Sequence, residues 1–231
     1  MRIILLLLAV AVPAWGGELR VGVAANFKPT LLRINAGFEE STGHRVIVSS
    51  ASTGMLYNQL RQGAPFHLFL AADRQAPEQL QAGGHGPADG RFCYAVGRLV
   101  LAGAARLDDL ANPDLSLAIA NPATAPYGSA AEEVLSRPEF AGGAGRRRVQ
   151  GANAAQAHQF WYSGGTELAL LPRSLVADGI AIPATWHRPI EQHALVLRAG
   201  EDYPPVDAYL EWLKSDTVRT LITHAGYDPC P

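Results

Sequence analysis

The sequence predicts an α/β protein in which mainly parallel sheets are covered by helices. Three observations support this fold class. Short apolar stretches alternate with amphipathic ones along nearly the whole chain, which is the pattern of layered α/β folds. Several of the expected strands end in small or polar residues that also begin the next helix. Finally, 231 residues with 48% apolar and 17% charged residues are enough for one large domain or two smaller lobes.

The expected strands are short and apolar or β-branched, and turn-forming residues bound most of them. In chain order they are 18–25 (ELRVGVAA), which alternates; 45–50 (RVIVSS), which is β-branched; 68–72 (LFLAA), which is apolar throughout; 91–102 (RFCYAVGRLVLA), which is long and contains Gly97; 117–120 (LAIA); 149–150; 168–171 (LALL); and 193–198 (HALVLR). A strand buried on both faces reads as an apolar run, as in 68–72 and 168–171.

The expected helices place apolar residues three or four positions apart, so that one face of each helix meets the sheet. Residues 27–42 show this spacing and end at Gly43, and Leu56 and Leu60 share one face of 54–62. The further helices expected are 77–82, 127–135, 153–162, 206–215 and 217–225, with a helical turn at 107–110.

The first 16 residues have the features of a secretory signal peptide. Arg2 supplies the positive start, residues 3–12 are an uninterrupted apolar run, and small residues precede the expected cleavage after Gly16. The alternative is a membrane anchor, but the run is shorter than the roughly 20 residues that a membrane-spanning helix needs. We therefore expect the mature chain to be exported, with the bacterial periplasm as its location.

Charge and cysteine content exclude several classes of protein. With 19 basic and 21 acidic residues the chain lacks the basic excess of a nucleic-acid binder. The seven histidines include no pair at helical metal spacing, and two cysteines cannot form a cysteine-based zinc site. An oxidising compartment permits a disulfide between Cys93 and Cys230, and two free thiols are the alternative.

Four expected junctions between a strand and a helix carry the functional argument. The residues at these junctions are Asn26, Ser52 and Thr53, Tyr127, and Asn153 and Ala154. The first backbone N–H groups of a helix have no partner within the helix and attract anions. In open α/β sheets such helix starts gather at the carboxyl edge of the strands, where ligands bind. The alternative is ordinary helix capping by these side chains.

The sequence resembles the periplasmic molybdate-binding proteins of ABC transporters over nearly the whole mature chain. The matching stretches occur in order: 24–27 (AANF), 52–60 (STGMLYNQL), 63–73 (GAPFHLFLAAD), 94–101 (YAVGRLVL), 120–132 (ANPATAPYGSAAE), 151–157 (GANAAQA), 189–192 (PIEQ) and 226–227 (GY). None of these motifs is decisive alone, but the ordered set is specific.

This resemblance implies a two-lobed binding-protein fold of type II with the ligand in the cleft between the lobes. It implies a first lobe of residues 17–95 and 198–231 and a second lobe of residues 96–197. The chain would cross between the lobes near 95–99 and return near 196–199. The family fold would also bring the chain end towards Cys93, so that a bridge to Cys230 becomes feasible.

The resemblance also implies the ligand and its contacts. Molybdate would be held by backbone amides and neutral side chains, with Asn26, Ser52 and Thr53 in the first lobe and Tyr127, Asn153 and Ala154 in the second. Molybdenum would be bound as the oxyanion without direct protein ligands, and no cofactor is expected. The implied partner is an inner-membrane ABC permease, and no nucleic acid is expected to bind. The chain would be a monomer. It would be a binding protein and not an enzyme.

Two positions depart from the family pattern, and three functions remain as alternatives. Asn26 stands where many members have serine, and Pro172 stands where many have a ligand-binding tyrosine, which Tyr127 would replace. The alternatives are the same fold with another oxyanion such as sulfate or phosphate, the effector domain of a transcription regulator, and an exported hydrolase. The sequence does not separate molybdate from tungstate.

Overall fold

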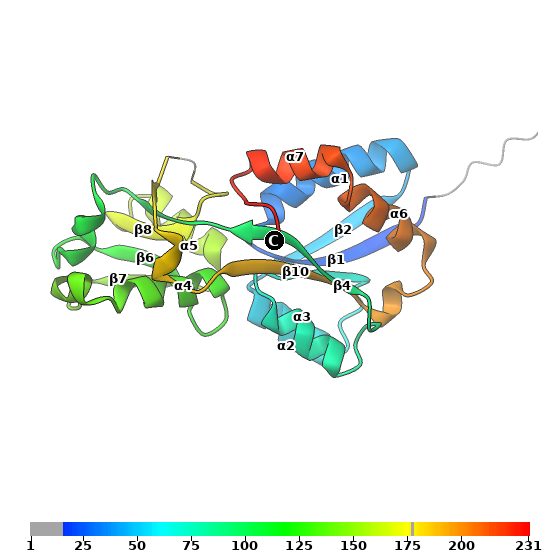
Figure 1. Cartoon of the computed structure of the whole chain (residues 1–231), viewed down its shortest axis with the longest axis horizontal. Coiled ribbons are helices and arrows are strands. Elements are labelled where there is room, and N and C mark those ends of the chain that lie inside the picture. Colours follow the sequence, from blue (N-terminus) through cyan, green and yellow to red (C-terminus); the bar gives the residue numbers. More distant parts are fainter. Residues whose placement is uncertain (1–15, 177) are drawn as a thin grey trace, which may run out of the picture.

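The computed structural model describes residues 16–176 and 178–231. The expected signal peptide, apart from Gly16, lies outside the described residues. Two five-stranded sheets lie side by side, each with helices on its faces (Figure 1). Within the described ranges, no helix combines the length and apolarity needed to cross a membrane.

The first sheet has the strand order β2-β1-β3-β10-β4. Its strands are β1 (Glu18–Ala24), β2 (Arg45–Ala51), β3 (Leu68–Leu70), β4 (Arg91–Gly97) and β10 (Ile190–Val196). Strand β1 pairs in parallel with both β2 and β3, with Val23 opposite Ser50 and Leu70. The carboxyl ends of these three strands therefore lie at one edge of the sheet.

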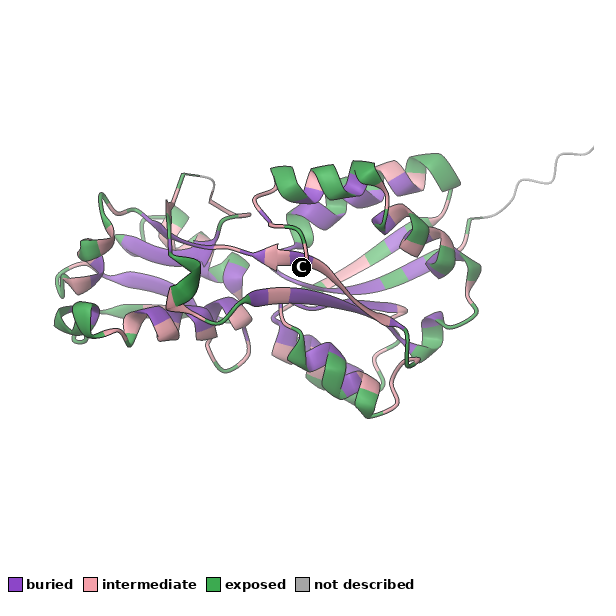
Figure 2. Cartoon of the chain, viewed as in Figure 1, coloured by how far each residue is buried: buried purple, intermediate pink, exposed green. Residues whose placement is uncertain are grey.

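Helices cover both faces of this sheet, and together they form the first lobe. On one face lie α1 (Lys28–Thr42), α6 (Pro204–Leu213) and α7 (Asp216–His224), and on the other lie α2 (Thr53–Arg61) and α3 (Gln75–Ala82) (Figure 1). Helix α1 ends at Gly43, whose φ of 74° is the left-handed conformation that glycine adopts without strain. Buried residues concentrate between the layers (Figure 2).

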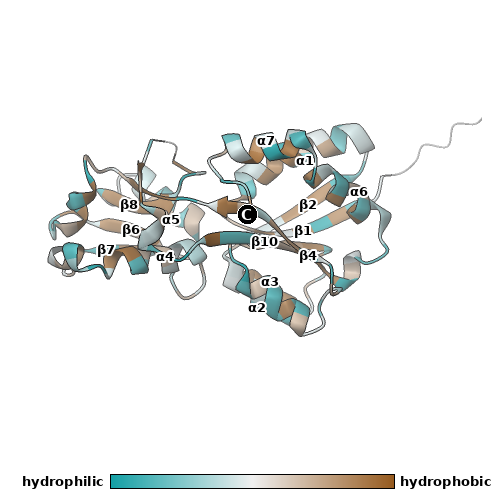
Figure 3. Ribbon diagram, in the orientation of Figure 1, coloured by the Kyte–Doolittle hydropathy of each residue, from teal (hydrophilic) through white to brown (hydrophobic). Residues whose placement is uncertain are grey.

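The second sheet has the order β7-β6-β8-β5-β9. Its strands are β5 (Leu99–Ala102), β6 (Leu117–Ala120), β7 (Arg148–Gly151), β8 (Leu168–Pro172) and β9 (Ile180–Ala181). Helices α4 (Pro126–Leu135) and α5 (Ala154–Tyr162) pack on it and complete the second lobe. Apolar residues dominate β6 and β8, as expected for strands with helices on both faces (Figure 3). The described ranges also contain four short 3₁₀ helices: Leu107–Ala111, Pro138–Gly143, Ala184–Trp186 and Arg198–Gly200.

The expected long strand 91–102 is two strands that belong to different sheets. It divides at Arg98, between β4 and β5, within the range 95–99 where the family resemblance implies the first crossing between the lobes. The expected return near 196–199 is wrong, because β10 already pairs with β4 in the first sheet from Ile190 onward. Residues 190–196, which the family resemblance implied to be part of the second lobe, are therefore paired with the first sheet.

The expectation of mainly parallel sheets holds for only part of each sheet. Strands β1, β2 and β3 are parallel, as are β6, β7 and β8. Strand β10 is antiparallel to β3 and β4, and β5 is antiparallel to β8 and β9. The antiparallel pairs arise because the chain runs out through β4 and β5 and comes back through β10, so the strands next to the crossings run in opposite directions.

Cys93 and Cys230 form a disulfide, with Cα atoms 6.1 Å apart and 137 positions apart in the sequence. This confirms the bridge and excludes two free thiols. Next to it, Val96 and Asp228 exchange backbone hydrogen bonds of 2.8 and 2.9 Å. The end of the chain is thus attached to β4 just before the crossing to the second lobe.

Candidate functional site

The structure brings all six site residues expected from the sequence into the lining of one small pocket between the lobes. Its lining consists of Ala24, Ala25, Asn26, Ser52, Thr53, Ala72, Ala125, Pro126, Tyr127, Asn153 and Ala154. These residues come from the carboxyl ends of strands and the starts of the helices that follow them. Helices α2, α4 and α5 begin at the pocket wall, at Thr53, Pro126 and Ala154. Unpaired N–H groups and positive helix ends therefore converge there.

The pocket is polar but uncharged. Of the residues that line it, none is Asp, Glu, Lys, Arg or His. Asn26, Ser52, Thr53 and Tyr127 are each 2% exposed. An anion would therefore meet neutral donors in a site shielded from water, and no hydroxyl of this lining has a histidine or carboxylate beside it in the lining to act as a general base.

Helix capping explains only Asn153 among the candidates. Its side-chain oxygen accepts a hydrogen bond of 3.0 Å from the backbone N–H of Gln156, as an N-cap does. Ser52 stands at the same position of α2 but makes no capping bond. Its buried hydroxyl has no hydrogen-bond partner among the described residues. A buried polar group without a partner is costly, so the Ser52 hydroxyl points to a ligand.

Two further hydroxyl oxygens in the lining accept a hydrogen bond from the protein, which leaves each hydroxyl proton free to be donated to a ligand. Thr53 Oγ1 accepts from the backbone N–H of Ala72 at 2.9 Å. The Tyr127 hydroxyl oxygen accepts from Gln192 Nε2 at 3.2 Å. With Ser52, these make three hydroxyls whose protons have no acceptor among the described residues, which suits a ligand that only accepts hydrogen bonds.

The Asn26 side chain donates its hydrogen bonds within the protein and not towards the pocket. Its side-chain Nδ2 donates to Gln192 Oε1 at 3.0 Å and to the Tyr227 hydroxyl at 3.2 Å. Both N–H bonds of the amide are therefore used within the protein. The group that Asn26 can still donate to a ligand in the pocket is its backbone N–H, just before the start of α1.

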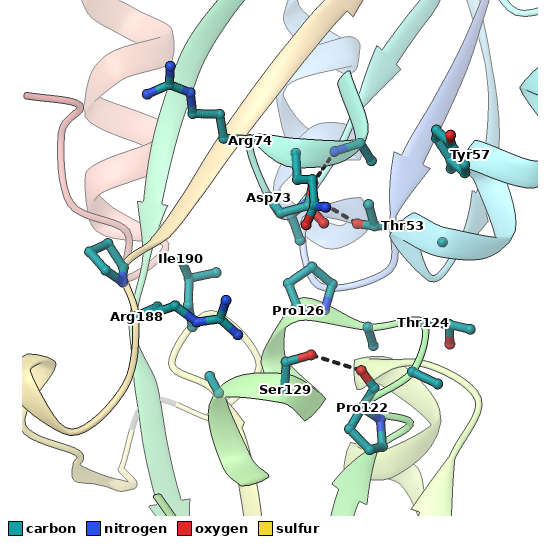
Figure 4. Close-up of a pocket in the computed structure, with 18 of the residues that line it drawn as sticks. Thr53, Tyr57, Asp73, Arg74, Pro122, Thr124, Pro126, Ser129, Arg188 and Ile190 are labelled. Atoms are coloured by element: carbon teal, nitrogen blue, oxygen red, sulfur yellow. Dashed lines mark hydrogen bonds between the residues drawn. The ribbon is translucent and has the colours of Figure 1, made fainter. Parts of the chain in front are cut away.

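A wider groove of about 440 Å³ lies beside the small pocket and shares Thr53, Ala72, Ala125 and Pro126 with it. Figure 4 shows Thr53 from the first lobe facing Pro126 and Thr124 from the second. The backbone N–H of Gly54 donates to the Thr124 carbonyl oxygen at 2.9 Å across this gap.

The lobes also touch on another path, where Ser174 Oγ donates to the Asn26 carbonyl oxygen at 3.3 Å. Together with the Gly54–Thr124 bond, this contact means that the structure has the cleft closed around the pocket.

The tyrosines around the pocket stay protonated. Burial raises the pKa of Tyr127 well above its ordinary value, and burial likewise raises the pKa of Tyr94 and Tyr227. Asp73 lines the wider groove beside the pocket, which we call the outer groove. Burial raises the pKa of Asp73, although its carboxylate accepts a hydrogen bond from the Ala76 N–H at 2.8 Å. The hydroxyl donors of the pocket therefore remain neutral throughout the physiological pH range.

Sequence reasoning missed a layer of side chains beneath the pocket. Gln192, Tyr94 and Tyr227 were part of matching motifs but received no role. The neighbours of Gln192 in β10 are Glu191 and His193, so the local sequence offered no apolar pattern that would have marked it as buried. Pro172, at the position of the tyrosine expected in many relatives, is the last residue of β8 and pairs with Leu99.

Comparisons with known proteins find relatives that align over nearly the whole chain. The chain is 40% identical to the molybdate-binding protein ModA of Azotobacter vinelandii, over 94% of this chain and 92% of that protein. It is 36% identical to the ModA protein of Rhodobacter capsulatus, over 96% and 92%. The solved periplasmic molybdate-binding protein of A. vinelandii superimposes with a TM-score of 0.85 and 33% identity, over 93% of this chain and all of that one.

The family comparison covers almost all of the described structure. The model of the family described as bacterial extracellular solute-binding protein matches residues 19–228. This range includes both sheets except the first residue of β1, and every residue of the pocket lining. The chain belongs to the bacterial extracellular solute-binding proteins, a family of binding proteins with a type II two-lobed fold.

Proposed function

We propose that this chain is the periplasmic component of an ABC transporter that captures molybdate and delivers it to a membrane permease. The two relatives compared above are named as molybdate-binding proteins and align over more than nine tenths of the chain. The observation in this chain that carries the proposal is the uncharged pocket lined by hydroxyl donors. Ser52, Thr53 and Tyr127 surround it with hydroxyl protons that have no acceptor among the described residues.

The chemistry of molybdate fits this set of groups. At neutral pH molybdate is a dianion without a proton, so each of its oxygens accepts hydrogen bonds. Hydrogen phosphate would bring a proton into a pocket whose lining has no carboxylate or imidazole to accept it, a mismatch of about 1–3 kcal/mol. Each hydrogen bond to a charged group contributes about 1.5–3 kcal/mol, against about 4–15 kcal/mol lost on association. Several such bonds are sufficient for tight binding without a single lysine or arginine.

The ligand set follows from size and protonation. Tungstate is a tetrahedral dianion of nearly the same size as molybdate, and we expect it to bind comparably. Sulfate also carries no proton but is smaller, so it would leave some donors without contact. Molybdenum would enter only as its oxyanion, with no protein atom bound to the metal and no cofactor required.

Binding across the cleft supports a transport role. Ser52 and Thr53 belong to the first lobe and Tyr127 and Ala154 to the second, so one anion would hold both lobes together and favour the closed form. The closed form would present a fixed surface of both lobes to the inner-membrane permease. A monomer is sufficient, because one chain supplies the complete pocket.

Titration calorimetry of the mature chain with molybdate, tungstate, sulfate and hydrogen phosphate tests the proposal. We expect one molybdate per chain, similar affinity for tungstate, and much weaker binding of the other two. The Thr53→Val variant keeps the shape of the side chain, removes its hydroxyl donor, and should weaken molybdate binding by about tenfold or more. Absence of molybdate binding, or equal binding of hydrogen phosphate, would refute the proposal.

A further inference from the structure

We propose that Gln192 is a positioning residue that makes Tyr127 a hydrogen-bond donor towards the pocket and so selects anions that carry no proton. This inference rests on the proposed function and adds a specificity device to it. Gln192 does not line the pocket. It acts through Tyr127, which does.

Gln192 lies at the centre of a buried network under the pocket. It is 0% exposed and belongs to β10, at the junction between the lobes. Its Oε1 accepts from Asn26 Nδ2 and lies 3.0 Å from the Tyr94 hydroxyl. Its Nε2 donates to the Tyr127 hydroxyl oxygen at 3.2 Å. The amide thus points its oxygen into the first lobe and its N–H groups towards the second.

This orientation fixes which way the Tyr127 hydroxyl is polarised. A phenol has one proton to donate and an oxygen that accepts. Because the oxygen accepts from Gln192, the proton remains for another acceptor, and none is present among the described residues. Tyr127 lines the pocket, so a bound oxyanion is the acceptor that completes its hydrogen bonding.

The surrounding backbone leaves room for this contact. The pairing of β10 with β4 matches Gln192 with Ala95 and His193 with Cys93, so Tyr94 is an extra residue in β4. A β-bulge of this kind redirects side chains, and the Tyr94 hydroxyl reaches both the Ala71 carbonyl oxygen and Gln192. At Gly97, a Cβ atom would collide with the Tyr127 hydroxyl and press on Gln192 Nε2. The close approach therefore requires glycine.

The same arrangement occurs on the opposite wall of the pocket. Thr53 Oγ1 accepts from the Ala72 N–H at 2.9 Å, which also leaves its proton for a ligand. On that wall the donor is a backbone group and cannot be exchanged by mutation. On the Tyr127 wall the donor is a side chain, so the polarity of the hydroxyl can be reversed experimentally.

The Gln192→Glu substitution should reverse the polarity of the Tyr127 hydroxyl. A carboxylate at this position accepts from Asn26, Tyr94 and Tyr127, and three donors favour its ionised form. The Tyr127 proton then points to the introduced carboxylate, and a lone pair of the tyrosine faces the pocket. Molybdate loses a donor, whereas hydrogen phosphate gains an acceptor for its proton.

The measurement is the ratio of the affinities for molybdate and hydrogen phosphate, by calorimetry at about pH 8. Both ligands are then mainly dianions, so the added negative charge weakens both alike and cancels in the ratio. We expect Gln192→Glu to lower the ratio by about tenfold or more, equivalent to about 1.4 kcal/mol. Gln192→Met adds no charge and frees the Tyr127 hydroxyl to rotate, so it should lower the ratio by a smaller factor. This second variant keeps the inference testable if the glutamate variant fails to fold.

Two control variants separate polarity from charge and from packing. Gln79→Glu adds the same charge at an exposed position beside the outer groove, so it should leave the ratio unchanged. In a Tyr127→Phe background there is no hydroxyl to orient, so Gln192→Glu should no longer alter the ratio.

The outcomes distinguish this inference from the proposed function. A lower ratio in the Gln192 variants that disappears in the Tyr127→Phe background supports it. An unchanged ratio, with the affinities for both anions lowered alike, would overturn the inference about Gln192. The proposed function, molybdate binding by the unaltered chain, would still stand. Failure of the unaltered chain to bind molybdate would overturn the proposed function instead.

Discussion

The backbone N–H of Gly54 donates to the carbonyl oxygen of Thr124 at 2.9 Å, and this bond joins the two lobes across the mouth of the pocket. Gly54 belongs to the first turn of α2, and Thr124 lies just before α4. A Cβ atom on residue 54 would lie 3.1 Å from Thr124 Cα and 3.2 Å from its carbonyl oxygen. The absence of a side chain at Gly54 therefore permits the lobes to close to this distance.

Gly54→Ala should weaken molybdate binding and leave the ligand-free protein as stable as before or more so. The added methyl group opposes closure at a cost of about 1–2 kcal/mol, which is a typical penalty for overpacking. In the open form it meets no opposite lobe, and alanine favours the helix by about 0.5–1 kcal/mol over glycine. Calorimetry and thermal unfolding measure the two effects separately.

Gly145→Ala is the matched control, since a Cβ there has nothing within 4 Å. It should alter neither closure nor affinity. Unchanged affinity in Gly54→Ala would show that the Gly54–Thr124 contact is not part of the bound state.

Ser52→Ala should also have opposite effects on stability and binding. Removal of a buried hydroxyl without a partner costs the protein nothing and relieves up to about 1 kcal/mol of desolvation. The same change removes a donor to a dianion, worth about 1.5–3 kcal/mol. Ser136→Ala, in an exposed serine at the far end of α4, should leave molybdate affinity at the wild-type value. A Ser52→Ala variant that binds normally would exclude Ser52 from the site.

Breaking the Cys93–Cys230 bridge should lower the stability of the chain strongly. The bridge spans 137 positions, and the chain-entropy model assigns a loop of that length about 5 kcal/mol. The paired Cys93→Ser and Cys230→Ser replacement should therefore lower the midpoint of urea unfolding, while molybdate affinity stays close to the wild type because neither residue lines the pocket. An unchanged midpoint would contradict this account of the bridge.

Acidification below about pH 6.5 should destabilise the fold through partly buried histidines. Burial lowers the pKa of His67, His158 and His193 from their ordinary value of 6.5. For His193 the charges of Arg91 and Arg74 lower it further, and Glu191 opposes them. The unfolded chain then binds more protons than the folded one, so stability is present above pH 6.5 and is lost as the pH falls through the lowered values. His193→Gln should flatten the pH dependence of the melting temperature between about pH 5.5 and 7, and a melting temperature constant over this range would contradict the prediction.

Local patterns in the sequence were sufficient to predict the fold class and the junctions that form the pocket. Asn26, Ser52, Thr53, Tyr127 and Ala154 all follow a strand and precede or begin a helix, and such junctions meet at one sheet edge whenever the strands are parallel. Their convergence from two lobes followed from the family resemblance and is present in the structure.

The parts that sequence reasoning missed depend on contacts between distant segments. The run 91–102 contains Gly97 next to Arg98, but a single glycine does not show that the chain leaves one sheet for another there. The early return at Ile190 depends on pairing with Gly97, 93 positions away. Gln192 is linked to Asn26 and Tyr127 over separations of 166 and 65 residues, so no local pattern could assign it a role.

Anomalous diffraction at the molybdenum absorption edge, from crystals of the chain grown with molybdate, tests the central claim most directly. We predict one strong peak per chain in the pocket. Its distance from Ser52 Oγ, Thr53 Oγ1 and the Tyr127 hydroxyl should leave room for one molybdate oxygen between the metal and each donor. A peak only on the outer surface, or no peak in the pocket at saturating molybdate, would contradict the assignment of this site.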